Sequence, residues 1–304
     1  MSAPNPVTAG FRAVTRDPAL FFMEAAWRWS FGTAALLLLW HAFRILPSAE
    51  TIMHAGVAAW NSRNPMLIAT TLVRIEEQSG HRVSAVALFV LPVITLLWVA
   101  LSALGRVAGL RRFSPEHYQD CGLTIFGLHL LRAAFLWIGV FTVIGTAGVE
   151  GQLATYGNHL DYIRFYLMAL PSFLLIGFLW LVVNWHLFLA PICAGNGMSA
   201  YQAIRRAVRL GRTLRAELAS VSALSGLLRV AGILIVFVIC IATSAWMGPA
   251  PQRYSLLVAA VTLLYFAFAD FLFAARQASF AMIVTPPAEA QVFAPGAAET
   301  RATV

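Results

Sequence analysis

Lysine is absent from the sequence, and charge of either sign is scarce, since only 11% of the 304 residues are Asp, Glu, Lys or Arg. Apolar residues make up 60%. Soluble domains are about 25% charged and about 45–50% apolar, even with glycine counted. A soluble fold of this length could not cover so much apolar surface, so the composition predicts a membrane protein.

The net charge of +8 comes entirely from arginine. A basic chain can bind nucleic acid, but that function needs a basic soluble face. Here most arginines flank apolar runs, as the residues that orient membrane proteins do. We therefore predict the lipid bilayer as the partner and no nucleic acid.

Sequence motifs for catalysis and metal binding are missing. Cys121, Cys193 and Cys240 lie far apart, without CxxC or zinc-type spacing, and are expected to act as small apolar residues. There is no Walker-type glycine loop, no GxSxG and no HExxH. We therefore predict no catalytic residues, no metal and no cofactor, and a protein that is not an enzyme. The N-terminal segment also lacks the features of a cleaved signal peptide, so its first apolar run is expected to be retained.

Long apolar runs define the architecture. A membrane-spanning helix needs about 20 mostly apolar residues. Six segments qualify, at 28–46, 83–104, 124–146, 163–190, 221–247 and 255–283. We predict an all-α polytopic membrane protein with one transmembrane domain at 1–285. A tail at 286–304, rich in proline and alanine, is predicted to be disordered.

The distribution of arginines predicts the orientation. Most arginines outside the six spans fall in segments on the side of the N-terminus, and cytoplasmic loops carry such an excess. Both termini are therefore expected in the cytoplasm. The absence of lysine is typical of a GC-rich bacterium, so we expect a bacterial inner membrane.

An internal repeat suggests three hairpin-like units. The segment LLRAAFLWIGVFTVIG at 130–145 aligns without gaps to LLRVAGILIVFVICIA at 227–242, and a looser copy begins at Trp27. Each unit would consist of an amphipathic interfacial helix, an outgoing span and a returning span. Chance similarity between apolar segments is the alternative.

The segment at 199–218 has the most specific pattern. On a helix, one face would carry only apolar residues: Ala200, Ala203, Ala207, Leu210, Leu214 and Leu218. Five arginines accompany it, with the middle members on the opposite face: Arg205, Arg206, Arg209, Arg212 and Arg215. This pattern predicts an interfacial helix facing the anionic lipids of the inner leaflet. A solvated loop is the alternative.

The loop at 47–82 contains a second helical signal. Asn64-Pro65 reads as a helix start and Ser79-Gly80 as its stop. We expect an amphipathic helix here on the outer membrane surface.

A family resemblance rests on AIRRAVRLGRTLRAEL, which runs into SGLLRVAGILIVFVI. This pattern resembles the six-helix bacterial membrane proteins of the YciC type, and the membrane domain attached to some glycerophosphodiester phosphodiesterases. The resemblance covers about the last third of the chain and implies a six-helix fold. It supplies no catalytic residues.

Charged residues inside predicted spans are costly and are candidates for function. They are Arg132, Arg229, Asp270 and Arg276. One interpretation is a proton or anion relay. The other is a structural ion pair, with arginines that extend to the headgroups.

Two histidines, His129 and His186, lie near the cytoplasmic ends of the third and fourth predicted spans. A facing pair of imidazoles can bind a haem or a metal. They are equally compatible with a role as polar residues at the interface.

Three functions fit this sequence. The first is a non-enzymatic integral membrane protein, a subunit or scaffold of a membrane assembly that also contacts other membrane subunits. The second is a transporter or permease component, and the third is an intramembrane redox subunit that uses His129 and His186.

Overall fold

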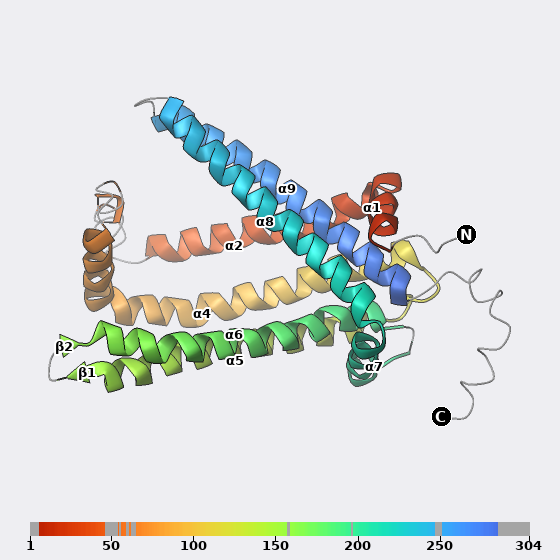
Figure 1. Cartoon of the computed structure of the whole chain (residues 1–304), viewed down its shortest axis with the longest axis horizontal. Helices are drawn as coiled ribbons and strands as arrows, with labels where there is room; N and C mark the ends of the chain where they lie inside the picture. Colours follow the sequence, from red (N-terminus) through yellow and green to blue (C-terminus); the bar gives the residue numbers. More distant parts are fainter. Residues whose placement is uncertain are drawn as a thin grey trace. The chain divides into compact units, whose positions relative to one another are not determined.

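The fold is helical almost throughout. The computed structural model describes residues 6–45, 54, 56–58, 61, 65–156, 159–195, 197–246 and 251–284. The principal helices are α1 (Pro6–Arg16), α2 (Ala19–Ile45), α4 (Pro65–Phe113), α5 (Gly122–Ala154), α6 (Tyr162–Cys193), α7 (Ala200–Thr213), α8 (Arg215–Trp246) and α9 (Pro251–Val284). Strands β1 (Thr155–Tyr156) and β2 (His159–Leu160) form a small antiparallel hairpin between α5 and α6 (Figure 1). The predicted all-α fold is confirmed.

In the described part of the chain, five helices are long and apolar enough to cross a membrane. They cover Leu88–Phe113, Gly122–Ala154, Ile163–Cys193, Arg215–Thr243 and Tyr254–Val284. These segments contain the second to sixth predicted spans or overlap them over most of their length. Their shafts expose large apolar side chains, such as Leu175 and Phe237 at 60% and 61%, which is the surface expected for lipid contact. The chain is therefore an integral membrane protein with several spans.

The first predicted span, 28–46, falls within α2, apart from its last residue, which lies outside the described part of the chain. α2 is not one of the five apolar helices. Arg28, His41 and Arg44 lower its mean hydropathy. Helix formation is confirmed here, and the crossing itself stays a prediction.

The helix predicted to begin at Pro65 does begin there, but the predicted stop at Ser79-Gly80 is wrong. The helix continues through these residues to Phe113. Figure 1 shows that its first part is sharply bent relative to the next. Glycine and serine permit such bends without ending a helix.

The chain divides into two compact parts. The smaller part, Ala26–Ser102, holds most of α2 and α4. The larger part, Met1–Ala25 with Ala103–Val304, holds the remaining helices. The predicted tail at 286–304 lies outside the described residues.

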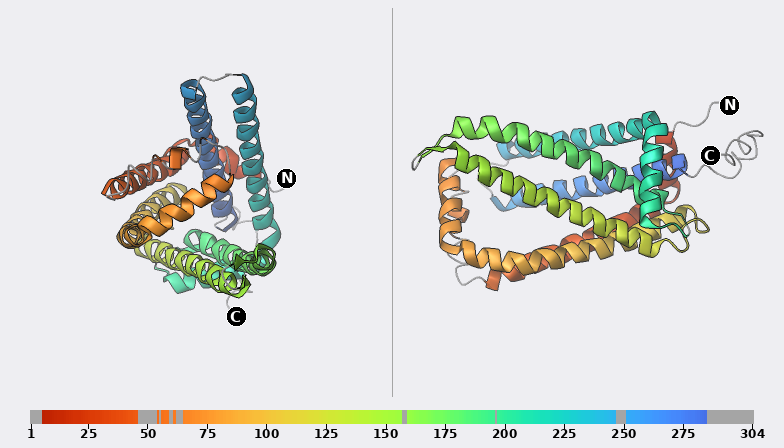
Figure 2. Two further views of the ribbon diagram at one scale, coloured as in Figure 1. Left: turned by 90° about the vertical axis from the view of Figure 1, so that its left-hand side faces the viewer. Right: turned by 90° about the horizontal axis from the view of Figure 1, so that it is seen from below.

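Two helical hairpins organise the larger part. α5 packs along α6, and α8 packs along α9 (Figures 1 and 2). The hairpin of α8 and α9 agrees with the third of the predicted hairpin-like units. Buried residues gather at one end of these hairpins, where α7 and the 114–121 turn pack against the end of α6. The largest of these buried side chains include Tyr118, Ile125, Leu128, Leu189, Ile192 and Leu218.

Helix α1 packs against the last third of α9. Pro6 opens this helix, a position where the missing N–H costs nothing. Val14 is buried against Ala275 and Ala278, whereas Arg12 is exposed. Gly10 allows the closest approach, because a Cβ at this position would lie 2.8 Å from the backbone nitrogen of Ser279.

Candidate functional site

Helix α7 is defined by its cap. Ser199 precedes it, and the Ser199 hydroxyl accepts a hydrogen bond of 3.3 Å from the Gln202 amide. The Gln202 side chain accepts one of 2.9 Å from the Ser199 amide in return. This capping box satisfies two donors that the first turn would otherwise leave unpaired. Helix formation over 200–213 is confirmed, and the end of the predicted segment belongs to α8.

The apolar face of α7 packs on protein. Ala203 and Ala207 are fully buried, and a Cβ at Gly211 would lie 3.1 Å from the ring of Trp185 on α6. Figure 2 (right) shows α7 lying crosswise to the long helices. An interfacial helix usually buries such a face in lipid. Here the small residues fix α7 to the end of α6 instead.

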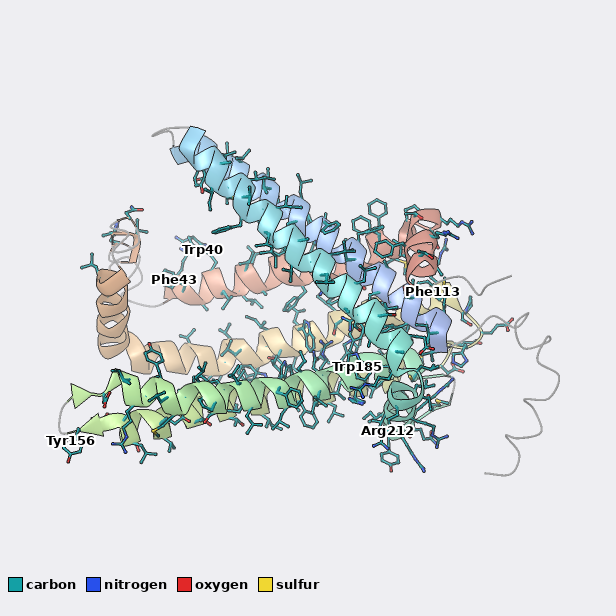
Figure 3. The ribbon with its side chains drawn as sticks, in the orientation of Figure 1. Trp40, Phe43, Phe113, Tyr156, Trp185 and Arg212 are labelled. Atoms are coloured by element: carbon teal, nitrogen blue, oxygen red, sulfur yellow. The ribbon has the colours of Figure 1, made fainter. Side chains whose placement is uncertain are left out.

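The opposite side of α7 carries exposed arginines. We call Arg205, Arg209 and Arg212 the arginine face, and all three side chains are exposed. Figure 3 shows Arg212 on the side of α7 away from the long helices, at the end of the larger part opposite Tyr156. Arg215, at the start of α8, is also exposed. This arrangement leaves the guanidinium groups available to an anionic surface.

Arg206 differs from the other arginines of this segment. Its side chain is half-buried, and Nη1 donates to the carbonyl of Cys193 over 3.4 Å. Nη1 also lies 3.9 Å from the sulfur of Met198. Arg206 therefore connects α7 to the end of α6 by a hydrogen bond. This role differs from the predicted contact with lipid.

A second group of arginines lies between the long helices. We call Arg106, Arg132, Arg229 and Arg276 the arginine cluster; they come from α4, α5, α8 and α9. Arg106, Arg229 and Arg276 lie against the rings of Phe188 on α6 or Phe273 on α9. The guanidinium carbon of Arg106 lies 5.3 and 5.2 Å from these two ring centroids, and that of Arg276 lies 4.4 Å from Phe188. Such cation–π contacts favour a guanidinium over the face of a ring.

Arg229 and Arg132 lie close to the first two members of the cluster. The guanidinium carbon of Arg229 lies 5.7 Å from the ring centroid of Phe273. Arg276 is within electrostatic range of both Arg229 and Arg132. The structure thus brings together the three arginines that the sequence singled out inside its predicted spans.

Arg106 was missed by the sequence reasoning, because it lies just beyond the second predicted span, 83–104. It is 4% exposed and lies on the same face of α4 as buried Ala103 and Leu110. The helical spacing of these three positions is the signal that could have placed Arg106 in the interior.

Asp270 is 5% exposed and lies on α9, one turn before Phe273. Asp270 is the acidic residue of α9, and Phe273, one turn further, contacts two arginines of the cluster. The predicted ion pair between Asp270 and Arg132 or Arg229 stays a prediction. Buried charge of this kind is stable only when it is compensated.

The two histidines have different surroundings. Nδ1 of His129 lies 3.0 Å from the carbonyl of Ile125, and the ring is within electrostatic range of Arg106 and Arg132. The ring of His186 lies against Trp185 and faces Gly211 of α7. No group of three metal-ligating side chains occurs among the described residues. The haem hypothesis stays untested.

The turn before α5 is held firmly against α6. The Tyr118 hydroxyl donates to the Ile192 carbonyl over 2.7 Å. Burial raises the pKa of the Tyr118 hydroxyl and of the Cys121 thiol. Burial, together with the charge of Arg206, lowers the pKa of His117. These groups are therefore uncharged near neutral pH, and Cys121 is an unreactive thiol.

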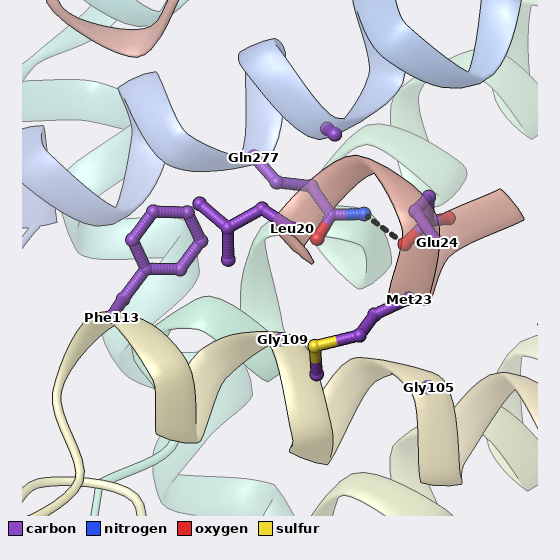
Figure 4. Close-up of a pocket in the computed structure, with 8 residues that line it drawn as sticks. Leu20, Met23, Glu24, Gly105, Gly109, Phe113 and Gln277 are labelled. Carbon is purple, nitrogen blue, oxygen red and sulfur yellow. Dashed lines mark hydrogen bonds between the residues drawn. The ribbon is translucent and has the colours of Figure 1, made fainter. Parts of the chain in front are cut away.

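A small cavity lies where α2, α4 and α9 meet within the larger part (Figure 4). The Gln277 amide donates to the Glu24 carboxylate over 3.2 Å at its wall. The cavity volume is about 10 Å³. A space of this size holds at most a single water molecule, so it is not a site for an organic substrate.

Comparison of the chain with protein families, curated proteins and solved structures gives no match. The candidate site therefore rests on the geometry of the arginine face and the arginine cluster.

Proposed function

We propose that the protein is a non-enzymatic subunit or scaffold of a bacterial inner-membrane assembly, with its arginine-bearing end on the anionic cytoplasmic leaflet. The resemblance to membrane proteins of the YciC type implies a six-helix membrane fold and leaves the function open. Partners of the assembly would meet the exposed apolar shafts of the spans. The proposed function involves neither catalysis nor a cofactor.

The observation that carries this proposal is the geometry of α7. Its small residues hold it against the end of α6, so the backbone that carries the arginine face is packed on the protein. Each arginine near an anionic surface contributes about 1 kcal/mol of attraction. A helix already fixed to the protein loses little further entropy when it meets lipid.

The contact between α1 and α9 supports cytoplasmic positions for both termini. α1 packs against Ala275 and Ser279, near the end of α9. Both segments therefore lie at the same side of the membrane. Five crossings between them would place them on opposite sides, so we infer that α2 supplies the sixth crossing.

The experiment compares lipid retention by purified variants in mild detergent. The triple variant Arg205→Gln, Arg209→Gln, Arg212→Gln should bind phosphatidylglycerol up to roughly 100-fold more weakly, from about 1 kcal/mol for each arginine. Binding of phosphatidylcholine should not change. Raising the salt should weaken binding by the unmodified protein, because the Debye length is about 10 Å at 0.1 M.

Two controls make the result specific. The triple Arg→Lys variant at the same positions keeps the charge and should retain phosphatidylglycerol. Arg164→Gln removes an exposed arginine in the first turn of α6, at the end of that helix opposite α7. This variant should also behave like the unmodified protein. Equal loss in the Gln and Lys variants would contradict an electrostatic contact with lipid.

The transporter and the redox subunit are the competing functions. Replacement of His129 and His186 by alanine would abolish electron transfer in a redox subunit. Asp270→Asn would reduce solute flux in a transporter whose fold is intact. A scaffold should lose only stability or assembly in these variants.

A further inference from the structure

The arginine cluster carries more positive charge than the nearby carboxylates can balance. It contains four guanidinium groups. Among the residues that the structure describes, the buried carboxylates of this region are Glu24 and Asp270, each 5% exposed. Even if both carboxylates are assigned to the cluster, two positive charges remain. Cation–π contacts attract a guanidinium but do not neutralise it, and unbalanced charge is unfavourable away from water.

Neutral side chains accept hydrogen bonds from two members of the cluster. Nε of Arg132 donates to the side-chain oxygen of Asn184 over 2.9 Å, and Nη2 of Arg276 donates to the Ser222 hydroxyl over 3.3 Å. Nε of Arg276 is buried and has no acceptor in the part of the chain that the structure describes. These contacts orient the guanidinium groups while leaving their charge in place. Guanidinium groups match the geometry of phosphate oxygens in particular.

The cluster is accessible from the lipid side. Arg132 and Arg229 are half-buried. Leu136 is 41% exposed one helical turn from Arg132, and Ile233 is 52% exposed one turn from Arg229. Acyl chains can pack on these apolar side chains while a headgroup reaches the arginines.

The depth of the cluster is also that of a headgroup. α5 and α9 are about 50 Å long at 1.5 Å per residue, which exceeds a hydrocarbon core of about 30 Å by about 10 Å at each end. Arg132 lies about 15 Å from the start of α5, and Arg276 lies about 12 Å from the end of α9. Both are therefore within a few ångströms of the boundary between acyl chains and headgroups.

We propose that the arginine cluster binds the phosphate group of a single anionic phospholipid, whose acyl chains lie against the exposed flanks of α5 and α8. This lipid site rests on the proposed contact with anionic lipid, but it uses different arginines. The arginine face meets many exchanging lipids at the surface, whereas the cluster holds one lipid between helices. Salt should therefore release the first kind of lipid and leave the second, since buried charges are screened much less.

The test is native mass spectrometry of the full chain in mild detergent at about 0.5 M salt, a concentration that screens exposed charges. Phosphatidylglycerol, phosphatidylcholine and inorganic phosphate are added separately. We expect one bound phosphatidylglycerol on the unmodified protein and on the triple Gln variant of the arginine face. Arg229→Gln and Arg276→Gln should weaken this binding roughly 10- to 100-fold, the loss typical of a hydrogen bond to a charged group.

The matched variants separate charge from geometry and from folding. Arg276→Lys keeps the charge but loses the planar fork, so binding should fall less than in Arg276→Gln. If the Gln variants do not fold, the site is tested instead by the thermal unfolding of the unmodified protein in the presence of each lipid. At this salt concentration phosphatidylglycerol should raise its midpoint in proportion to the logarithm of lipid concentration, and phosphatidylcholine should not.

Each outcome has a defined meaning. Salt-resistant phosphatidylglycerol binding that depends on Arg229 and Arg276 supports the lipid site. Binding of inorganic phosphate alone supports the phosphate chemistry and assigns it to a soluble ligand. Equal binding of both lipids, or binding unaffected by Arg229→Gln and Arg276→Gln, would overturn the site. Loss of only salt-sensitive lipid in the triple variant tests the arginine face separately.

Discussion

Replacing Gly10 by alanine inserts a methyl group where α1 meets α9. The new Cβ would overlap the Ser279 hydroxyl and the Ala275 carbonyl, and would lie 2.8 Å from the Ser279 nitrogen. Two of these three atoms belong to the backbone of α9, so no change of side-chain rotamer can relieve the overlap. We expect α1 to separate from α9.

The size of the effect follows from two opposing terms. Overpacking of a closely packed contact costs about 1–3 kcal/mol. Alanine favours a helix over glycine by about 1 kcal/mol, but this gain applies equally to separated α1 if it remains helical. The docking equilibrium should therefore shift by roughly 5- to 150-fold, at 1.4 kcal/mol for each factor of ten.

Limited proteolysis measures this shift. Trypsin cleaves after Arg12 and Arg16, which are exposed on α1, but cleavage requires local opening of the helix. When opening is fast, the cleavage rate follows the population of the open form. The Gly10→Ala variant should be cleaved faster than the unmodified protein by the same factor of roughly 5 to 150. Gly226→Ala is the matched control, because a Cβ at that position meets nothing within 4 Å. Equal cleavage of the two variants would refute the reasoning.

Three further predictions concern topology, pH and buried charge. A cysteine at exposed Tyr156 should react with an impermeant reagent from outside the cell, and a cysteine at Arg209 should not; the reverse would contradict the orientation. Because the pKa of His117 is lowered from 6.5, the unfolded state takes up the proton first, and thermal stability should fall as the pH drops below about 6.5. His117→Gln should flatten this dependence in melting curves between pH 7.5 and 5.5. Asp270→Asn should lower the free energy of unfolding by about 3–5 kcal/mol if its carboxylate compensates the arginine cluster, and adding Arg229→Met should restore part of it. Additive losses in that double-mutant cycle would show that the two groups do not interact.

Patterns within a single helix were readable from the sequence. The apolar runs predicted six spans, and five of them coincide with described helices able to cross the membrane, because length and hydropathy are local properties. The spacing of Ala203, Ala207 and Leu218 predicted the buried side of the 199–218 segment, because helical periodicity is also local. The same spacing could not show whether the apolar face of α7 packs on protein or on lipid.

Contacts between distant segments were not readable. Arg106 follows the second predicted span, so the sequence left it out of the charged residues inside spans. In the structure it lies against Phe188 of α6 and Phe273 of α9. The stop predicted at Ser79-Gly80 failed because glycine and serine weaken a helix by only about 1 kcal/mol. The position of α1 on α9 joins segments more than 250 residues apart, and nothing local indicates that pairing.

The pairing of α1 with α9 also constrains how the chain can assemble. During synthesis α1 leaves the ribosome before any of the long helices, yet its partner surface at Ala275 and Ala278 is made last of all the described helices. Contacts so distant in sequence form late, because the loop between them must be closed first. Insertion of the spans can therefore proceed one after another, whereas closure of this end of the molecule has to wait for translation of α9. A chain truncated before Ala275 would insert most of its helices and leave the apolar side of α1 uncovered.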